Sequence, residues 1–523
     1  MRRVMYDATQ VKNFQYDEYY PAPPSLPPLR LAIPTVHFPE NYADRDAARR
    51  RIVYDEFFLL QCILARRRLS REKIHKPRPE ARPHLARDFI AQLPFVATGA
   101  QNRVIGEIEA DLHLPIPMNR LLQGDVGAGK TIVAVYALLL AVGEGKQAGI
   151  MAPTEILAEQ HYLNLRRWLE PLGVSIGLFT GSRKQKVAEP IGDALPGLAS
   201  EGGSIVVGTH ALLYDSYAAN DLGLIVIDEQ HKFGVLQRLA LAKKGQNPDV
   251  LVMTATPIPR TLGMTLYGDL DVSVLDEMPP GRQKIVTAVR SPKEAAKAWK
   301  FMAEQIALGR QAYVVYPLIE ESEKIDAKAV QKEYERIKTE FPKLNVGLLH
   351  GRMRPQEKEA VMTDFRSGKV QVLVCTPVIE VGVDVPNATI MIIENAERFG
   401  LAQLHQLRGR IGRGSEKSYC VLIGEPKSKE SWRRLKIMEE TNDGFRIADE
   451  DLKIRGPGNM FGTEQSGLPP LRWADLFADA DLLAQARQDA EKIIRADPTL
   501  QKFPDLRDML DNSGSSQTLA AVS

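Results

Sequence analysis

In the middle of the chain, hydrophobic residues fall in short continuous runs. Segments with helical periodicity lie between these runs. The runs lie at 121–122, 149–151, 205–207, 224–227 and 251–253. Strands of a parallel sheet are buried on both faces, so they read as continuous apolar runs rather than as alternating ones. The pattern therefore predicts an α/β domain built on a parallel sheet at residues 91–278.

The same pattern repeats in the second half of the chain. Further strands are predicted at 312–316, 346–349, 372–375, 390–393 and 419–423. Between the two series, residues 278–281 read Met-Pro-Pro-Gly, which is typical of a hinge. We therefore expect a second, similar domain at residues 279–425 and an α/β fold class with two parallel-sheet domains in tandem.

The segments that flank the two domains differ from them in composition. Residues 1–40 are rich in Tyr and Pro and predict an extended arm, because proline lacks a backbone donor and disfavours regular helix. Residues 41–90 combine helical apolar spacing with many Lys and Arg, so we expect a helical basic linker. Residues 426–510 predict a more helical region, and residues 511–523 a disordered tail.

The basic residues of the linker leave two interpretations open. Arg and Lys recur between positions 45 and 87, with few carboxylates among them. Such a run is typical of a surface that follows a phosphate backbone. It is equally typical of the solvated face of a helix that turns Phe57 and Leu60 inward.

Composition and cysteine usage indicate a globular protein in a reducing compartment. The chain has 523 residues, 44% hydrophobic and 26% charged, with a net charge of +2. Cys62, Cys375 and Cys420 are far apart and form no C-x-x-C pair, which argues against structural zinc. No apolar run reaches the ~18–20 residues that span a membrane, and the first residues do not form a secretory signal. We therefore expect a cytoplasmic protein without a membrane partner.

Residues 124–131 read GDVGAGKT, which fits the pattern G-x-x-x-x-G-K-[ST] of a phosphate-binding loop. Gly124 begins the loop, while Gly127 and Gly129 tolerate positive φ and leave room for phosphates. The apolar run at 132–142 predicts a helix whose N-terminus offers unpaired N–H groups to the ligand. Lys130 is then expected to hold the β- and γ-phosphates of ATP, and Thr131 to place its hydroxyl on Mg²⁺.

Two carboxylates follow the predicted strand at 224–227. Ligands of open α/β sheets bind at the carboxyl ends of the strands, where Asp228 and Glu229 would lie. We expect Asp228 to hold Mg²⁺ and Glu229 to orient or deprotonate the attacking water.

Residues 406–413 read QLRGRIGR and lie in the second predicted domain. Arginines can spread the charge of a transferring phosphoryl group, so Arg410 and Arg413, with Arg408 beside them, are candidate arginine fingers. A basic surface turn is the alternative interpretation. Fingers from a second domain would close over ATP and open after hydrolysis, as in an ATP-driven motor.

The ordered motifs resemble those of superfamily 2 helicases over about residues 90–480. They include APTE at 152–155, GTHA at 208–211, TATP at 254–257, LHGR at 349–352 and CTPVIEVGVD at 375–384. The segments at 444–452, 455–458 and 462–467 are similar to the translocation element of the RecG branch. The resemblance implies two RecA-like domains and a C-terminal translocation region. It also implies an ATP-dependent DNA helicase, or double-stranded DNA translocase, that acts on branched DNA in recombination, repair or replication-fork processing.

The resemblance further implies roles for single residues. The nucleotide-binding set implied in this way adds Gln101, Asp125, Gly382 and Asp384 to the phosphate-loop residues. The residues implied to contact DNA are Thr154, Thr209, His210, Arg352 and Thr376, and those implied to couple hydrolysis to movement are Phe445, Arg455 and Gln465.

One departure from the RecG pattern limits the functional prediction. RecG proteins carry a large N-terminal wedge domain, and only a segment similar to the linker after it is expected here. We therefore expect ATPase and duplex translocation, with fork remodelling weak or dependent on a protein partner that supplies the fork-splitting function. Two alternatives stay open: a non-catalytic or weakly active regulatory DNA-binding paralogue, and an RNA helicase, which the 444–467 block disfavours.

Overall fold

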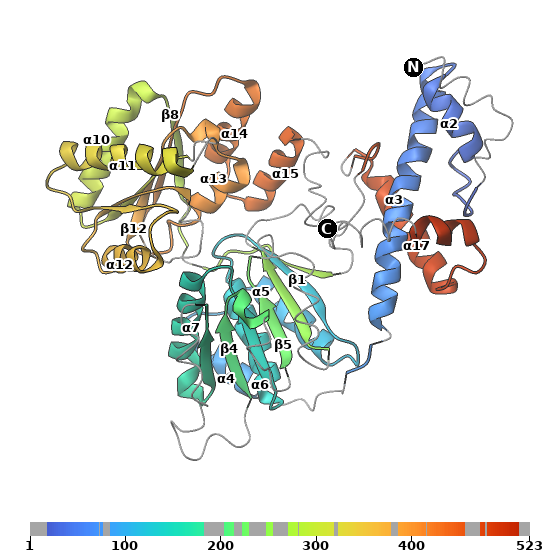
Figure 1. Ribbon diagram of the computed structural model, residues 1–523, viewed down its shortest axis with the longest axis horizontal. Helices are drawn as coiled ribbons and strands as arrows, with labels where there is room; N and C mark the ends of the chain where they lie inside the picture. The colour runs from blue at the N-terminus through green and yellow to red at the C-terminus, as the bar shows by residue number, and fades with distance from the viewer. Residues whose placement is uncertain are drawn as a thin grey trace.

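We describe the chain from a computed structural model. The residues described are 18–72, 74–76, 84–181, 203–213, 222–229, 247–254, 270–280, 282–317, 323–377, 385–414, 416–455, 471–475 and 478–511. Two sheet domains lie one above the other in Figure 1, and a helical lobe stands beside them.

The first sheet has seven strands, paired in parallel in the order β3-β4-β2-β5-β6-β1-β7. They are β1 (Asn119–Gly124), β2 (Gln147–Met151), β3 (Ser175–Phe179), β4 (Ser204–Gly208), β5 (Leu222–Ile227), β6 (Asp249–Thr254) and β7 (Asp271–Leu275). The helices of this domain are α4 (His84–Gln92), α5 (Gly99–Leu112), α6 (Lys130–Gly143) and α7 (Glu155–Leu169). The five predicted strands and the predicted helix are confirmed.

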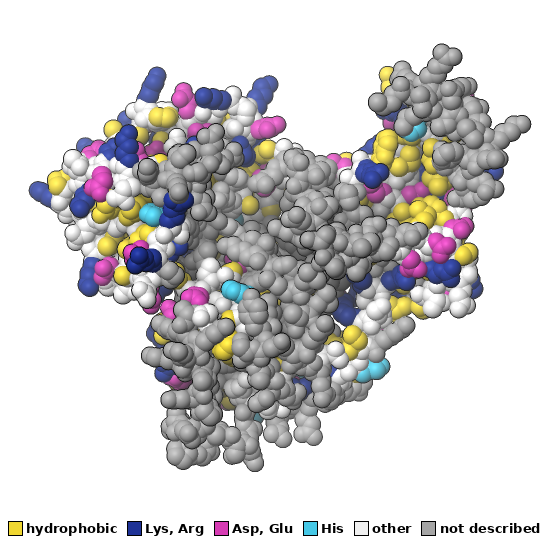
Figure 2. Space-filling model, viewed as in Figure 1, with side chains coloured by type: hydrophobic (Ala, Val, Ile, Leu, Met, Phe, Trp, Pro, Cys, Tyr) yellow, Lys and Arg dark blue, Asp and Glu magenta, His cyan; other side chains and the backbone are white. Residues whose placement is uncertain are grey.

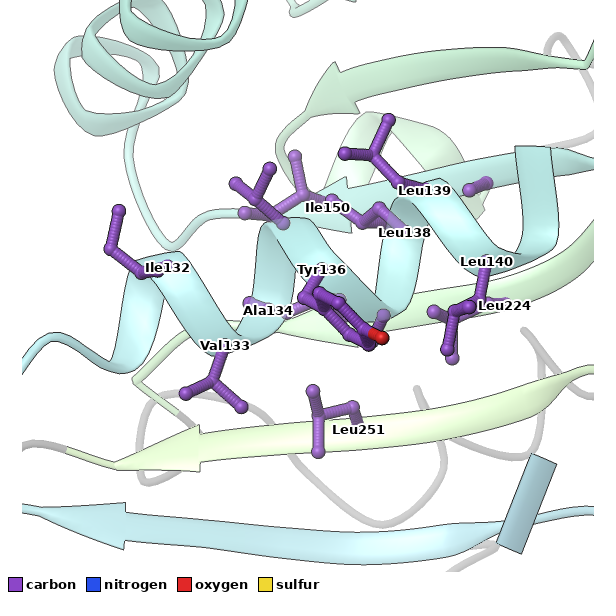
Figure 3. Close-up of a cluster of buried hydrophobic side chains, with 14 of the residues drawn as sticks. Ile132, Val133, Ala134, Tyr136, Leu138, Leu139, Leu140, Ile150, Leu224 and Leu251 are labelled. Atoms are coloured by element: carbon purple, nitrogen blue, oxygen red, sulfur yellow. The ribbon is translucent and has the colours of Figure 1, made fainter. Parts of the chain in front are cut away.

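Helix α6 runs through the core of the first domain. Its residues 132–142 are all buried, because an uninterrupted apolar segment has no face to turn to water. Figure 3 shows its side chains against Ile150 of β2, Leu224 of β5 and Leu251 of β6. This burial fixes the first residue of the helix, Lys130, at the carboxyl end of β1.

The second sheet has six strands, also paired in parallel, in the order β10-β11-β9-β12-β13-β8. They are β8 (Val286–Arg290), β9 (Gln311–Val315), β10 (Val346–Leu349), β11 (Val372–Cys375), β12 (Ala388–Ile393) and β13 (Tyr419–Ile423). Its helices are α10 (Ala295–Ala307), α11 (Glu323–Glu340), α12 (Pro355–Arg366) and α13 (Leu401–Arg408). The predicted fold class of two parallel-sheet domains is confirmed.

The extended conformation expected for residues 1–40 is wrong for part of that segment. Helix α2 (Leu29–His37) forms there despite Pro34, and it packs on the long helix α3 (Tyr42–Glu72). The carbonyl of Pro28 accepts the N–H groups of Leu31 and Ala32, so the helix begins directly after a proline. Packing on α3, which buries Ala32, compensates for the hydrogen bond that Pro34 cannot donate.

The second interpretation of the basic linker is confirmed, because α3 is a helix that buries Phe57 and Leu60 while several of its arginines stay partly exposed. Several cations of the linker also pair with distant carboxylates. These ion pairs are Arg49–Asp479, Arg50–Asp481, Arg51–Glu18, Arg66–Asp511, Arg68–Asp271 and Lys76–Asp249, with N···O distances between 2.6 and 3.2 Å. Two of the partners, Asp479 and Asp481, lie at the start of helix α17 (Ala480–Ala496), which packs along α3 (Figure 1). Figure 2 accordingly shows basic and acidic side chains interspersed over this lobe.

The predicted helical region after the second sheet is confirmed by α14 (Lys429–Glu440), α15 (Gly444–Arg455) and α17. All strands of the described residues belong to the two parallel sheets, so this part of the chain contains no five-stranded barrel. Among the helices that the structure describes, none combines the length and the apolar character needed to cross a membrane.

Candidate nucleotide site and its contacts with the second domain

The loop between β1 and α6 has a backbone that only glycine adopts readily. Gly127 and Gly129 have φ values of 81° and 86°. A Cβ atom at Gly129 would collide with the amide of Gln101, and one at Gly127 with the guanidinium of Arg282. The loop therefore forms a narrow cradle before the N-terminus of α6, and this shape fits a chain of phosphates.

Lys130 begins α6 and points back into this cradle. Its Nζ donates hydrogen bonds to the carbonyl oxygens of Gly124 at 2.8 Å and Asp125 at 2.9 Å. Loss of hydration lowers the pKa of Lys130, while the charges of Glu229 and Asp228 oppose this shift. The predicted phosphate-binding lysine and both predicted carboxylates thus lie within electrostatic reach of one another.

Asp228 and Glu229 follow β5, as the sequence predicts. Burial alone would raise the pKa of Asp228, but a hydrogen bond from His161 and the charges of His161 and Lys130 outweigh it, so the pKa lies below its usual value. His161 Nε2, on α7, lies 2.9 Å from Asp228 Oδ2. Glu229 has a φ of 54°, a left-handed conformation that non-glycine residues seldom adopt outside functional sites.

Arg410 of the second domain lies within electrostatic range of the same carboxylates. Burial and the neighbouring charge of Arg413 lower the pKa of Arg410 to about 10, and the charges of Glu229 and Asp228 act against that shift. Arg413 is half-buried, and its Nε donates to the carbonyl of Gly409. The structure therefore brings Lys130, Asp228, Glu229 and Arg410 together, with Arg413 beside Arg410.

Asp125 of the phosphate loop bonds to two elements distant in sequence. Its Oδ1 lies 2.5 Å from His405 Nε2 on α13, and its Oδ2 accepts the N–H of Gly444, the first residue of α15, at 3.1 Å. Burial would raise the pKa of Asp125, but these surroundings, with His405 the main contributor, lower it. The sequence analysis assigned Asp125 only to the nucleotide and missed His405.

Gln101 and Thr131 both lie beside the loop. Gln101 is buried: its Nε2 donates to the carbonyl of Ala128 at 3.1 Å, and its Oε1 accepts the N–H of Thr98 at 2.9 Å. It completes a capping box with Thr98 at the start of α5. Thr131 is half-buried on the first turn of α6, next to Lys130.

Three family models match successive parts of the chain. They are DEAD/DEAH box helicase at residues 98–265, helicase conserved C-terminal domain at 297–415, and ATP-dependent DNA helicase RecG, domain 3, C-terminal, at 441–510. A relative in Bacillus subtilis, an ATP-dependent DNA helicase RecG, is 48% identical over 494 residues, which cover 94% of this chain and 72% of the relative. The chain belongs to the RecG family.

Other RecG proteins extend beyond the part that this chain matches. The relative in Synechocystis is 51% identical over 92% of this chain but is covered over only 58% of its own length. The solved structure described as RecG bound to a three-way DNA junction superposes with a TM-score of 0.70 and 42% identity, over 86% of this chain and 59% of that one. The chain thus spans somewhat more than half the length of these RecG relatives.

The residues expected to contact DNA in a RecG-family protein lie after strands of both sheets. Thr154 caps α7 by accepting the N–H of Leu157 at 3.4 Å. The side chains of Thr209 and Thr376 are buried, whereas His210 and Arg352 are exposed. In this conformation, therefore, His210 and Arg352 are the more accessible members of the set.

Two of the residues expected to couple hydrolysis to movement belong to α15. Phe445 is half-buried in its first turn, and Arg455 is its last residue. Gly382, Asp384 and Gln465 lie outside the described residues.

Proposed function

We propose that this RecG-family chain hydrolyses ATP to move along double-stranded DNA and that it acts on branched DNA. One observation carries the proposal: Arg410 of the second domain lies within electrostatic range of Lys130, Asp228 and Glu229 of the first. A hydrolytic site that two domains share changes when the domains separate, so its chemistry can drive their relative motion.

Each residue of the shared site has a defined task in this proposal. When bound, ATP with Mg²⁺ supplies the phosphoryl group that is transferred to water. Thr131 and Asp228 would hold Mg²⁺, and the low pKa of Asp228 keeps that carboxylate ionised at neutral pH. Glu229 is placed to accept the proton of the attacking water, while Arg410 disperses the charge that develops on the phosphoryl oxygens.

Nucleic acid is proposed to lie across the carboxyl ends of both sheets. Arg352 and His210 are exposed there and offer donors that suit phosphate oxygens rather than base edges. A related RecG has been solved on a three-way DNA junction, which favours branched DNA as the substrate. Splitting of the fork arms is proposed to need a further element or a protein partner.

Steady-state ATPase measurements with different nucleic acids test this function. We expect hydrolysis to rise strongly with linear duplex or a three-way fork, less with single strands, and little with RNA. The stimulation should weaken as salt rises, because phosphate contacts release counterions. Stimulation by RNA alone would favour an RNA helicase, and no stimulation by any nucleic acid would favour a regulatory DNA-binding paralogue.

Two substitutions test the assignment of the site. Lys130→Ala should abolish hydrolysis, and Glu229→Gln should retain ATP binding but stop turnover, because the amide cannot take a proton. Lys146→Ala is the matched control, since the ammonium of Lys146 pairs with Glu144, with an N···O distance of 3.7 Å, and takes no part in the proposed site. Unchanged turnover in either site variant would remove the assignment.

A further inference from the structure

The carboxylate of Asp125 joins three parts of the molecule that lie far apart in sequence. His405 is 280 residues away and Gly444 is 319 residues away, yet both hydrogen bond to this one buried side chain. The hydrolytic chemistry proposed above does not use the carboxylate. The contacts of this carboxylate therefore indicate a further role. The inference of that role rests on the proposed function.

His405 continues the connection to Arg408. Arg408 Nη2 lies 3.0 Å from His405 Nδ1, and a guanidinium has no acceptor. Nδ1 must therefore accept, so the proton of the neutral imidazole is on Nε2 and is donated to Asp125. The histidine thus serves as acceptor on one side and donor on the other.

Arg408 extends the connection to the end of helix α14. Its Nη1 donates to the carbonyl oxygens of Met438 and Thr441, both at 2.8 Å. Asp125 meanwhile holds the N–H of Gly444 at the start of α15. The turn between α14 and α15 is therefore held on both sides by one hydrogen-bonded series that begins in the phosphate loop.

The other end of the series connects to Lys130. The backbone carbonyl of Asp125 accepts a hydrogen bond from Lys130 Nζ. Phosphate oxygens that bind Lys130 compete with that carbonyl, so a nucleotide changes the bonding of the same residue whose side chain holds the turn. Gly409 also packs closely on the loop, because a Cβ there would lie 2.7 Å from Val126 Cβ.

Space for movement exists beside the turn. A cavity of about 690 Å³ is lined by Asp125, His405, Arg408, Asp443 and Phe445, together with residues 276–278 and 282–285. The turn and the first residues of α15 can therefore shift without first displacing packed side chains.

We infer that Asp125, His405 and Arg408 form a relay that transmits the state of the phosphate loop to the α14–α15 turn. In this relay His405 is a positioning residue: it fixes the turn relative to the loop and does not touch the reacting atoms. The inference deepens the proposed function, because it names the contacts through which hydrolysis reaches the translocation region.

Two substitutions of His405 test the relay. His405→Phe preserves the ring shape but removes both hydrogen bonds. His405→Gln retains a donor for Asp125 and an acceptor for Arg408. His113→Phe is the control, since His113 is exposed at the end of α5 and its ring hydrogen bonds to the carbonyl of Glu109. Thermal unfolding of each variant shows whether it is folded.

The first readout is the ratio of triplex strand displacement along duplex DNA to ATP hydrolysed. We expect His405→Phe to lower this ratio about tenfold or more, because it removes the hydrogen bonds of His405 to two buried charged groups. His405→Gln should restore the ratio to within about twofold. Equal losses of displacement and hydrolysis in His405→Phe, or no loss of either, would overturn the relay.

The second readout needs no DNA and separates this inference from the proposed function. Hydrogen exchange of residues 441–447 is measured with and without ADP, beryllium fluoride and Mg²⁺. The nucleotide should change the exchange of this segment in the unaltered chain and not in His405→Phe. A bound nucleotide that leaves the segment unchanged in the unaltered chain refutes the relay, even if the chain moves on DNA.

Discussion

At the residue scale, the phosphate loop depends on the conformation of single glycines. Gly129→Ala should weaken nucleotide binding about tenfold or more, because a left-handed φ costs about 1–2 kcal/mol for alanine and the new methyl group meets Gln101. Gly145→Ala is a matched control, since Gly145 has a φ of 79° but open space around it. Titration with a fluorescent ATP analogue measures the nucleotide affinity of both variants. Equal affinities would contradict the prediction that the phosphate loop has no room for a side chain at Gly129.

His161 gives a second prediction at this scale. The variant His161→Ala leaves the carboxylate of Asp228 without its orienting hydrogen bond. We expect the Mg²⁺ concentration for half-maximal ATPase to rise about 10-fold or more, as is usual when an outer partner of a metal ligand is lost. Replacement of the exposed His210 should leave the Mg²⁺ requirement unchanged. If the Mg²⁺ concentration for half-maximal ATPase is the same in His161→Ala and in the original chain, His161 does not orient Asp228 for Mg²⁺ binding.

The sequence could reveal some residues of the site and not others for a simple reason. Asp228 directly follows the apolar run at 224–227, which marks the end of a buried strand, and Lys130 lies just before the run at 132–142, which marks the start of a buried helix. His161 and His405 are single imidazoles on helices, and their carboxylate partners lie 67 and 280 residues away. Nothing in local spacing indicates such pairs, because only the folded chain brings them together.

At the element scale, burial explains most of the strands that could be predicted, although the edge strand β10 was predicted with only two of its four residues buried. Central strands such as β5 and β12 are buried at every residue, so their sequences are continuously apolar. Strands β3, β7 and β8 were not predicted, and all three lie at sheet edges with only some residues buried. An edge strand covered by fewer neighbours has no need of a continuous apolar run.

Helix α3 allows a comparison between adjacent arginines. The side chain of Arg51 is fully buried and pairs with Glu18 and Asp55, whereas Arg50 is half exposed and pairs with Asp481. Arg51→Ala should lower the free energy of unfolding by about 3–5 kcal/mol, because it leaves carboxylates without their buried partner. Arg50→Ala should lower it by less than about 1 kcal/mol.

Urea unfolding of this lobe, followed by the fluorescence of Trp473 in a variant that lacks the other tryptophans, measures both changes. Similar free energies for the two variants would show that the buried cluster does not hold the N-terminal segment on α3.

At the scale of the whole molecule, hydrolysis should depend on the second domain. Arg410→Ala should lower the DNA-stimulated turnover number about 10³-fold, because an arginine finger supplies at least that much. Nucleotide affinity should change little, since the phosphate loop belongs to the first domain. Arg310→Ala is the control in the second domain, where Arg310 pairs with the exposed Glu416. If Arg410→Ala keeps the turnover number of the original chain, the second domain does not contribute Arg410 to ATP hydrolysis.

The pairing of α3 with α17 also determines when the molecule can be completed during its synthesis. Tyr54 and Asp489, which hydrogen bond across the two helices, are 435 residues apart. At ribosomal rates α3 would wait on the order of tens of seconds for its partner helix to appear. Until then the aromatic side chains of Phe57 and Phe58 have no α17 to cover them. The helical lobe is therefore expected to close last, and the nascent chain to be most prone to aggregation during that interval.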